Sequence, residues 1–342
     1  MNGFNLSNIQ DAKLGGTSLS AIYLGSNKLW PKAIDYSREY FTINSLANNN
    51  TISFSKSGSV ETKTIYWSSD KITWNSVSSD SGTIKTLNKY EKIYIKGSNN
   101  NYASTYSAYN HFNSNAQFNI SGNIMSLIYG DNFIGQTTLP SVNYIFGNIF
   151  RNSNVVDASH LILPATTLSN YCYAYMFYGC TSLTKAPALS ATTLVNNCYY
   201  NMFYGCTSLT EAPALPATTL ASNCYAFMFQ GCTSLITAQK KLPATTLAEW
   251  CYSSMFTGCT SLVIAPDLPA KTLSKYCYAW MFSGCTRLGF IECLATYIPY
   301  SNSCQSWVSN VAATGTFYKA ASMTSWSSGA NGIPSGWTVE NI

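Results

Sequence analysis

Charged side chains are scarce in this chain of 342 residues: Asp, Glu, Lys and Arg make up only 10% of it, and the formal net charge is +5. The basic residues are spread thinly and form no run along the sequence. Nucleic-acid-binding proteins concentrate positive charge in a patch or tail, so the composition argues against a nucleic-acid partner. A composition poor in charge but rich in Tyr, Ser, Thr and Asn is instead common in rigid extracellular and virion surface proteins.

Histidine is also rare, since His111 and His160 are the only two. A Ser/His/Asp or Cys/His catalytic arrangement therefore has little to draw on. No Gly-Lys-Ser or Gly-Lys-Thr phosphate loop occurs, and the carboxylates are few and scattered. We expect a protein that is not an enzyme and that uses no cofactor.

Long apolar runs are missing as well. No segment approaches the ~20 apolar residues of a membrane-spanning helix, and residues 1–7 have neither the basic region nor the apolar stretch of a secretory signal. We therefore expect a protein made in the cytoplasm, with no signal peptide and no membrane insertion. If it acts outside a cell, something other than ordinary secretion must carry it there.

The twelve cysteines do not have the spacing of a metal site. The repeated ones lie in pairs eight residues apart, and no Cys-x2-Cys occurs. Disulfides are not favoured either, because the sequence lacks the secretory signal that usually accompanies them. Free cysteine packs as a small hydrophobic residue. We expect no metal, and we expect reduced, buried cysteines stacked in two ladders.

The dominant feature of the sequence is a repeat over residues 168–285. Its wording is Thr-Leu-x3-Cys-Tyr-x2-Met-Phe-x-Gly-Cys-Thr-Ser-Leu-x2-Ala-Pro-x-Leu-Pro-Ala-Thr. The spacing is 26 residues, with one 27-residue step where Gln239, Lys240 and Lys241 add a position. A fixed period of this length predicts stacked units, each of which buries its apolar face against its neighbours. The first cysteine of each copy is Cys172, Cys198, Cys224, Cys251 or Cys277, and the second is Cys180, Cys206, Cys232, Cys259 or Cys285.

Each copy reads as a short helix followed by a short strand. Leu168, Cys172, Tyr175 and Met176 recur at three- and four-residue spacing, which predicts an amphipathic helix over 169–178 that stops at Gly179. Residues 181–186 are too few for a helix and suit a brief strand.

The repeat resembles a known family. Met-Phe-x-Gly-Cys-Thr-Ser-Leu followed by Pro-Ala-Thr-Thr-Leu is similar to the BspA-type leucine-rich repeat of gut bacteria and their bacteriophages, over roughly residues 131–342. The resemblance implies a leucine-rich-repeat solenoid of about six to seven coils. Residues 145–154 and 304–308 depart from the pattern, and we interpret both as terminal caps.

The predicted fold class is mixed α/β with several domains. Residues 1–33 form a β-hairpin attachment module, 36–130 an all-β sandwich, 131–314 the leucine-rich-repeat solenoid and 315–342 an irregular C-terminal cap. The hairpin comprises a strand at 19–24, a turn at 25–27 and a return strand at 28–30, and it resembles the start of many phage tail and appendage proteins. Strands of the sandwich are expected at 51–55, 64–67, 72–74, 83–85, 92–95, 118–121 and 124–128.

Candidate binding residues occupy repeat positions that vary or are aromatic. Variable positions on a constant scaffold are how repeat proteins present binding surfaces, although drift at solvated sites explains the variation equally well. The tyrosine column either forms an exposed aromatic stripe or packs each ring on the next coil with its hydroxyl in water. Trp67 and Trp74 are either glycan platforms or core residues. The candidate receptor-binding residues are Lys185, Glu211, Thr237, Ile264, Tyr173, Tyr199, Tyr225, Tyr252 and Tyr278, and the candidate virion-attachment residues are Ile22, Tyr23, Leu24, Leu29 and Trp30.

These features together predict a non-enzymatic structural and adhesive component of a bacteriophage particle, such as a fibre or a tail or capsid appendage. Its partners would be other virion proteins, through the N-terminal module, and a glycan or protein receptor on the bacterial surface. The alternative is a bacterial cell-surface leucine-rich-repeat adhesin whose signal lies outside this numbering, although Met1 argues against such trimming.

Overall fold

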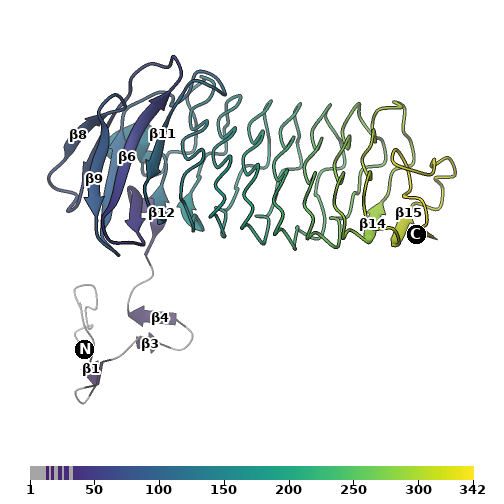
Figure 1. The fold of residues 1–342 in the computed structure, drawn as a ribbon, viewed down its shortest axis with the longest axis horizontal. Helices are drawn as coiled ribbons and strands as arrows, with labels where there is room; N and C mark the ends of the chain where they lie inside the picture. Colours follow the sequence, from purple (N-terminus) through teal and green to yellow (C-terminus); the bar gives the residue numbers. More distant parts are fainter. Residues whose placement is uncertain (1–12, 15–16, 19–21, 25–26, 31–33) are drawn as a thin grey trace.

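The computed structural model describes residues 13–14, 17–18, 22–24, 27–30 and 34–342 (Figure 1). Near the N-terminus, β1 (Lys13–Leu14) pairs with β2 (Thr17–Ser18), and β3 (Ile22–Leu24) pairs with β4 (Asn27–Trp30), both antiparallel. The pair β3–β4 is the hairpin predicted from the sequence. Residues 19–21 and 25–26, which carry the start of its first strand and part of its turn, lie outside the described residues.

Two antiparallel sheets follow along the chain. The six-stranded sheet has the order β13-β12-β5-β10-β7-β8, and the three-stranded sheet has the order β11-β6-β9. Only the β12–β13 pair in these sheets is parallel. The strands are β5 (Phe41–Ser45), β6 (Asn50–Ser57), β7 (Thr64–Ser68), β8 (Asn75–Ser78), β9 (Gly82–Leu87), β10 (Lys92–Gly97), β11 (Tyr109–Ser114), β12 (Phe118–Asn123) and β13 (His160–Ile162).

The two sheets share an apolar core because their strands alternate buried and more exposed residues. In β6 the buried residues include Ile52 and Phe54, and the Phe54 ring lies 5.0 Å from that of Phe112 on β11. This period of two is the pattern from which the strands were predicted. The sequence prediction missed β5, β8 and β11, whose polar residues obscure the alternation.

Two predicted strands of this region are wrong. Residues 72–74 form a turn, because the Asp70 carboxylate accepts hydrogen bonds from the backbone N–H of Ile72 and of Thr73, each 2.8 Å long. Residues 124–128 lead into α1 (Ser126–Tyr129), where the Asn123 side chain accepts from the Met125 N–H at 3.0 Å. In both places a short polar side chain captures backbone N–H groups that a strand would have used. The 3-10 turns η1 (Tyr36–Arg38) and η2 (Gly130–Asn132) flank the region.

Beyond residue 142 the chain winds in successive coils that stack along the long axis, here termed the coil stack (residues 143–310) (Figure 1). In the coil that contains Cys172, the backbone N–H groups of alternate residues form two kinds of hydrogen bond. Cys172 and its even-numbered neighbours donate their N–H to the carbonyl three residues back within the same coil. The odd-numbered residues between them donate to the next coil: Tyr171 to Asn196, Tyr173 to Cys198, Tyr175 to Tyr200, Phe177 to Met202 and Gly179 to Tyr204.

Left-handed residues at every fourth position allow this alternation. Tyr171, Tyr175 and Gly179 have φ values of 57°, 60° and 70°, and Asn197, Asn201 and Gly205 repeat the pattern in the next coil. A non-glycine residue in this conformation costs about 1–2 kcal/mol. The N–H groups directed to the next coil form hydrogen bonds that offset the cost, so the conformation is stable only in the stack.

The predicted fold class is therefore wrong. The segment 169–178, expected to be a helix, is a run of turns. In an α-helix each N–H bonds to the carbonyl four residues back and no residue has a left-handed backbone conformation, and this segment meets neither condition. Among the described residues the chain has sixteen strands and a single α-helix of four residues, so it is mostly β and not mixed α/β. The leucine-rich-repeat plan of a helical turn and a strand in each coil is not found. None of the described helices could cross a membrane, because none is long and apolar enough.

Aromatic rings form two buried columns along the coil stack. Phe203 and Phe229 stack with their centroids 5.5 Å apart and their planes 1° from parallel, and Tyr199 and Tyr225 stack at 5.7 Å. Each such pair contributes about 0.5–1.5 kcal/mol beyond the area that it buries. The first column contains Phe150, Phe177, Phe203, Phe229, Phe256 and Phe282, and the second contains Phe146, Tyr173, Tyr199, Tyr225, Tyr252, Tyr278 and Trp307.

The coil at 145–154 joins the stack to the sheets and is not a terminal cap. Phe150 stacks on Phe177 on one side and lies 6.0 Å from Phe112 of β11 on the other. The Phe112 N–H donates to the Ile149 carbonyl at 2.8 Å, so the backbone is bonded across the junction. The coil departs from the repeat because it packs against a sheet instead of another coil.

At the other end the chain adds a three-stranded parallel sheet, and between its last two strands residues 320–337 run through turns and loops. Strand β14 (Phe290–Cys293) pairs in parallel with β15 (Thr316–Lys319), which pairs in parallel with β16 (Thr338–Asn341). Trp307 covers the end of the tyrosine column, and its indole N–H donates to the Gly332 carbonyl at 2.7 Å.

All twelve cysteines are free and buried. The second cysteine of each repeat donates its S–H to a phenylalanine carbonyl of the preceding coil, over 2.9 Å for Cys180 to Phe150 and 3.1 Å for Cys232 to Phe203. Burial raises the pKa of Cys180 to about 11 and that of Cys172 to about 12. A raised thiol pKa leaves little reactive thiolate at neutral pH.

We therefore expect the folded protein to react with a thiol reagent such as DTNB at pH 8 at least about a hundredfold more slowly than the protein unfolded in guanidinium. The reason is that thiolate formation is disfavoured and access is blocked. All twelve thiols should titrate after unfolding without a reductant. Fewer than twelve would show that disulfides are present.

Candidate functional site

The four variable residues predicted as a receptor-binding column all lie on one side of the coil stack, here termed the ladder side. Lys185, Glu211, Thr237 and Ile264 are exposed, and Ile264 keeps 59% of its surface accessible. Phe290 of β14 continues the column, since it pairs with Ile264 across the next coil boundary. The structure thus brings together residues that lie 26 or 27 positions apart in the sequence.

The coils on this side are bridged in pairs. Parallel bridges join Asp157 to Lys185, Glu211 to Thr237, and Ile264 to Phe290. In the described chain no bridge joins Lys185 to Glu211 or Thr237 to Ile264. Two of the coil boundaries are therefore open at the surface.

A groove lies at each open boundary. The first has a volume of about 460 Å³, and Lys185 and Glu211 lie on its opposite walls. The second has a volume of about 880 Å³ and lies between Thr237 and Ile264. Both volumes fall within the usual ~300–1,000 Å³ of ligand sites. The larger groove is the better candidate site.

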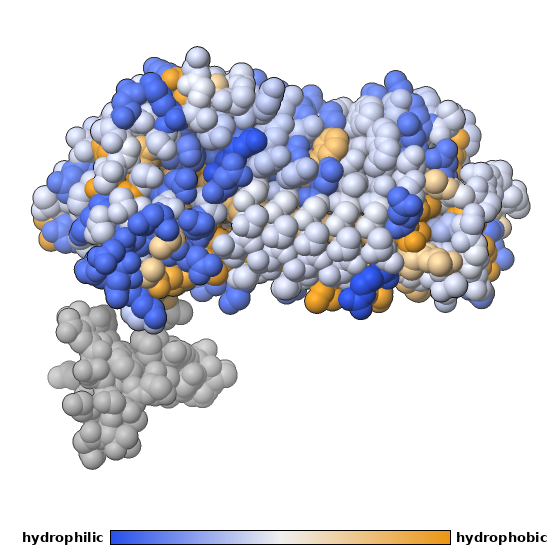
Figure 2. Space-filling model, viewed as in Figure 1, coloured by the Kyte–Doolittle hydropathy of each residue, from blue (hydrophilic) through white to orange (hydrophobic). Residues whose placement is uncertain are grey.

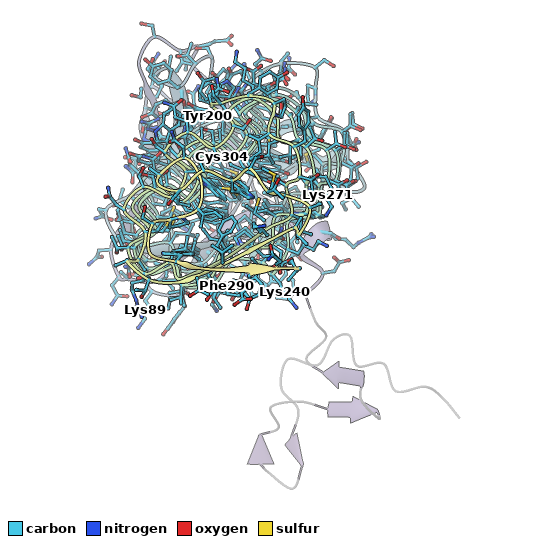
Figure 3. The ribbon with its side chains drawn as sticks, turned by 90° about the vertical axis from the view of Figure 1, so that its right-hand side faces the viewer. Lys89, Tyr200, Lys240, Lys271, Phe290 and Cys304 are labelled. Atoms are coloured by element: carbon cyan, nitrogen blue, oxygen red, sulfur yellow. The ribbon has the colours of Figure 1, made fainter. Side chains whose placement is uncertain are left out.

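The lining of the larger groove combines exposed apolar residues with three charged ones. Ile236, Val263 and Ile264 expose 57%, 39% and 59% of their surfaces. Lys240, Asp267 and Glu292 surround the apolar part. Figure 3, viewed along the stack, shows Phe290 and Lys240 at the same edge of the molecule. Figure 2 shows hydrophobic and strongly hydrophilic side chains next to one another along the corresponding lower edge.

The larger groove lies at the 27-residue step. The extra residue lets Gln239 turn back to the preceding coil, where its side-chain oxygen accepts from the Leu215 N–H at 2.7 Å. Beyond it the strands close again, because the Asp267 N–H donates to the Lys240 carbonyl at 2.8 Å. The added position was visible in the sequence, and it was the signal for this groove that sequence reasoning did not use.

Charges of both signs line the two grooves. The Lys185 ammonium lies 3.4 Å from the Asp157 carboxylate, in an exposed pair of small energetic value. Burial, together with the nearby Asp267 carboxylate, raises the pKa of Glu292, while Lys241 and Lys240 act in the opposite direction. A ligand of the larger groove therefore meets exposed apolar side chains together with charges of both signs.

The five tyrosines predicted as receptor contacts are buried. Tyr173, Tyr199, Tyr225, Tyr252 and Tyr278 expose 1–2% of their surfaces, so they cannot form a stripe that touches a receptor. Each ring packs on the next coil, as the alternative interpretation held, but the hydroxyls of Tyr173 and Tyr252 are buried and not in water. The sequence could not place the column, because a tyrosine after a cysteine fits either a helix surface or a turn interior.

A different set of rings is half-buried on the side formed by the turns, the side on which Figure 3 labels Tyr200. Tyr178 stacks on Tyr204 at 4.6 Å and 2°, and Trp250 stacks on Tyr276 at 3.9 Å and 13°. Stacked rings cover one another's faces and leave mainly their edges to solvent. This side therefore lacks the open ring faces that a stacking platform needs.

The remaining candidates are placed as follows. Trp67 packs against the core with the Lys85 ammonium 5.5 Å from its ring, and Trp74 lies under the Lys96 ammonium at 4.1 Å. Both are partly buried, so neither is an open platform. The attachment candidates Ile22, Tyr23, Leu24, Leu29 and Trp30 lie in the paired strands β3 and β4, and their side chains lie outside the described part of the chain. No group of three potential metal ligands occurs within the described residues.

Comparisons with protein-family models, with curated proteins and with solved structures found no match to this chain.

The buried Tyr252 hydroxyl allows a test of the tyrosine column. It has no hydrogen-bond partner among the described protein atoms, so Tyr252→Phe should change the free energy of unfolding by less than about 1 kcal/mol. Tyr252→Ala removes the ring and should cost about 3–5 kcal/mol. Denaturant unfolding followed by circular dichroism measures both. Equal losses in the two variants would mean that the hydroxyl, and not the ring, holds the column.

Proposed function

We propose that this protein is a non-enzymatic adhesive component of a bacteriophage particle and that the ladder side of its coil stack binds a receptor on the bacterial surface. The observation that carries the proposal is the pair of grooves at the open coil boundaries, which contain all four variable residues of the column. A surface with constant backbone and changing side chains is suited to recognition, because the scaffold tolerates substitution there.

Exposed apolar side chains support this choice of surface. Ile236 and Ile264 are among the most exposed large hydrophobic residues of the coil stack, and they lie together in the larger groove. Each loses contact with water when a partner covers the groove, which contributes about 25 cal/mol per Å² of apolar surface. Clustered apolar residues with a polar rim are typical of an interaction site.

The phage assignment rests on the resemblances described for the repeat and for the N-terminal hairpin. A two-stranded hairpin is not stable alone and needs a surface to dock on. In this proposal other virion proteins provide that surface for residues 1–33, and the sheets hold the coil stack away from the particle.

Receptor binding by the ladder side predicts a graded loss of adsorption. Replacing Lys185, Glu211 and Thr237 together with Ala should weaken adsorption to host cells about a hundredfold, if each contact contributes about 1 kcal/mol. Each single change should cost about tenfold or less. The melting temperature should stay within about 2 °C, because all three side chains are exposed.

A matched control carries the same residue types elsewhere: Lys89→Ala, Glu61→Ala and Thr73→Ala, all exposed in loops that connect the strands of the two sheets. The control should adsorb like the parent. If the Lys185, Glu211 and Thr237 variant adsorbs like the parent, and adding Ile264→Ala to it changes nothing, the ladder side is not the receptor site.

Particle attachment through the N-terminal module predicts a second outcome. Protein that lacks residues 1–33 should remain soluble and folded, because the sheets and the coil stack have their own core, but it should be missing from purified particles when they are analysed by mass spectrometry. Normal incorporation of the truncated protein would place the attachment elsewhere.

A further inference from the structure

A third side of the coil stack carries a second candidate site near the C-terminal end. The side is formed by the Thr-Thr-Leu turns and includes Lys271, which Figure 3 shows on a different edge from Phe290 and Lys240. Two hollows of about 520 Å³ and 460 Å³ lie there, and Tyr300 lines both. Tyr300 is thus a ridge between two adjoining cavities.

Two tyrosines on this side differ from the other rings of the coil stack. Tyr297 and Tyr300 expose 61% and 49% of their surfaces. No ring-to-ring contact within the described chain involves either of them, whereas Tyr178 and Trp250 are covered by stacked neighbours. Their ring faces are therefore available to a ligand.

The backbone under these rings is fixed. Tyr297 bridges to Thr272 of the preceding coil, its N–H donates to the Lys271 carbonyl at 3.1 Å, and its carbonyl accepts from the Leu273 N–H at 3.1 Å. The backbone carbonyl of Tyr300 accepts a hydrogen bond from the Ser303 N–H at 3.1 Å. Rigid aromatic side chains on an ordered backbone lose little conformational entropy on binding.

The remaining lining is rich in hydroxyl groups and poor in charge. Threonine and serine side chains line both hollows, and Lys271 is their only charged residue. Trp326 forms part of the second hollow. Open aromatic faces bind the C–H faces of sugar rings, and neutral hydroxyl groups exchange hydrogen bonds with sugar hydroxyls. A charged ligand would find only one partner of opposite sign.

We propose that Tyr297, Tyr300 and the two hollows beside them form a binding site for a neutral oligosaccharide, with one sugar ring packed on Tyr300 and its neighbours in the hollows. The site is separate from the grooves of the ladder side. It does not depend on the receptor role of the ladder side, so either proposal can fail alone.

The test uses the full-length protein and four probes: maltotriose, cellotriose, tri-N-acetylchitotriose and 3′-sialyllactose. Saturation-transfer NMR and calorimetric titration measure binding. At least one of the three neutral sugars should bind with a Kd of roughly 1 mM or below, equivalent to about −4 kcal/mol. Tyr297→Ala combined with Tyr300→Ala should weaken that binding at least tenfold.

Three further variants test whether the aromatic ring of Tyr300 is responsible for the binding, and not its hydroxyl or residues outside the site. Tyr300→Phe should retain most of the binding, because it keeps the aromatic face. Lys275→Ala removes an exposed lysine that lines neither hollow and should leave the binding of neutral sugars within about twofold. Tyr90→Ala removes an exposed tyrosine on the sheets and should have no effect. A circular dichroism melting curve for each variant shows whether it is folded, and Tyr300→Phe keeps the test decisive if the double variant is not.

Three results would overturn the proposal. The first is no binding of any neutral trisaccharide at about 10 mM. The second is parental binding by the folded double variant, or loss of binding in Tyr300→Phe equal to that in the double variant. The third is binding of 3′-sialyllactose alone that disappears in Lys271→Ala, which would identify an anion site.

Discussion

The structure depends on the registration of each coil with the next. Half of the backbone N–H groups in a turn segment, such as those of Tyr171, Tyr173 and Tyr175, have their acceptors in the following coil. A coil shifted by one residue would direct these groups at the wrong carbonyls and would also separate the stacked rings of Phe203 and Phe229. The inter-coil hydrogen bonds and the buried aromatic columns therefore impose the same register. The exposed side chains of the ladder side can vary because they contribute to neither.

The period of the repeat and the burial of its cysteines could be predicted from the sequence, but the local conformation could not. Cys172 and Met176 are four residues apart, and that spacing fits both a helix of 3.6 residues per turn and a run of turns with a period of four. The evidence for the second was present in Asn197, Asn201 and Gly205, which recur at four-residue spacing and are residue types that tolerate a positive φ. The inter-coil bonds that stabilise this conformation involve residues 25 or 26 positions away, so local propensity alone favoured the helix.

The candidate site could be predicted only in part, because it too depends on contacts between coils. Lys185, Glu211, Thr237 and Ile264 were placed on one surface because equivalent repeat positions share a side of the stack. The grooves between them depend on which coil boundaries are bridged, and apart from the added residue at the 27-residue step the sequence gives no sign of that alternation. Tyr173 and its equivalents fitted either an exposed aromatic stripe or rings packed on the next coil, and their position in the turn directs them inwards.

The direction of the inter-coil hydrogen bonds has a mechanical consequence. Because the coils are stacked along the long axis, those bonds run along it, and the sheets and β16 lie at opposite ends (Figure 1). Tension between the two ends would pull these bonds apart lengthwise, one coil boundary at a time, and would not shear a whole sheet. Each boundary holds its own hydrogen bonds and ring pairs, so the chain would lengthen in small steps while the remaining coils keep their structure. A molecule of this form would act as an extensible tether with a series of similar, separately released segments.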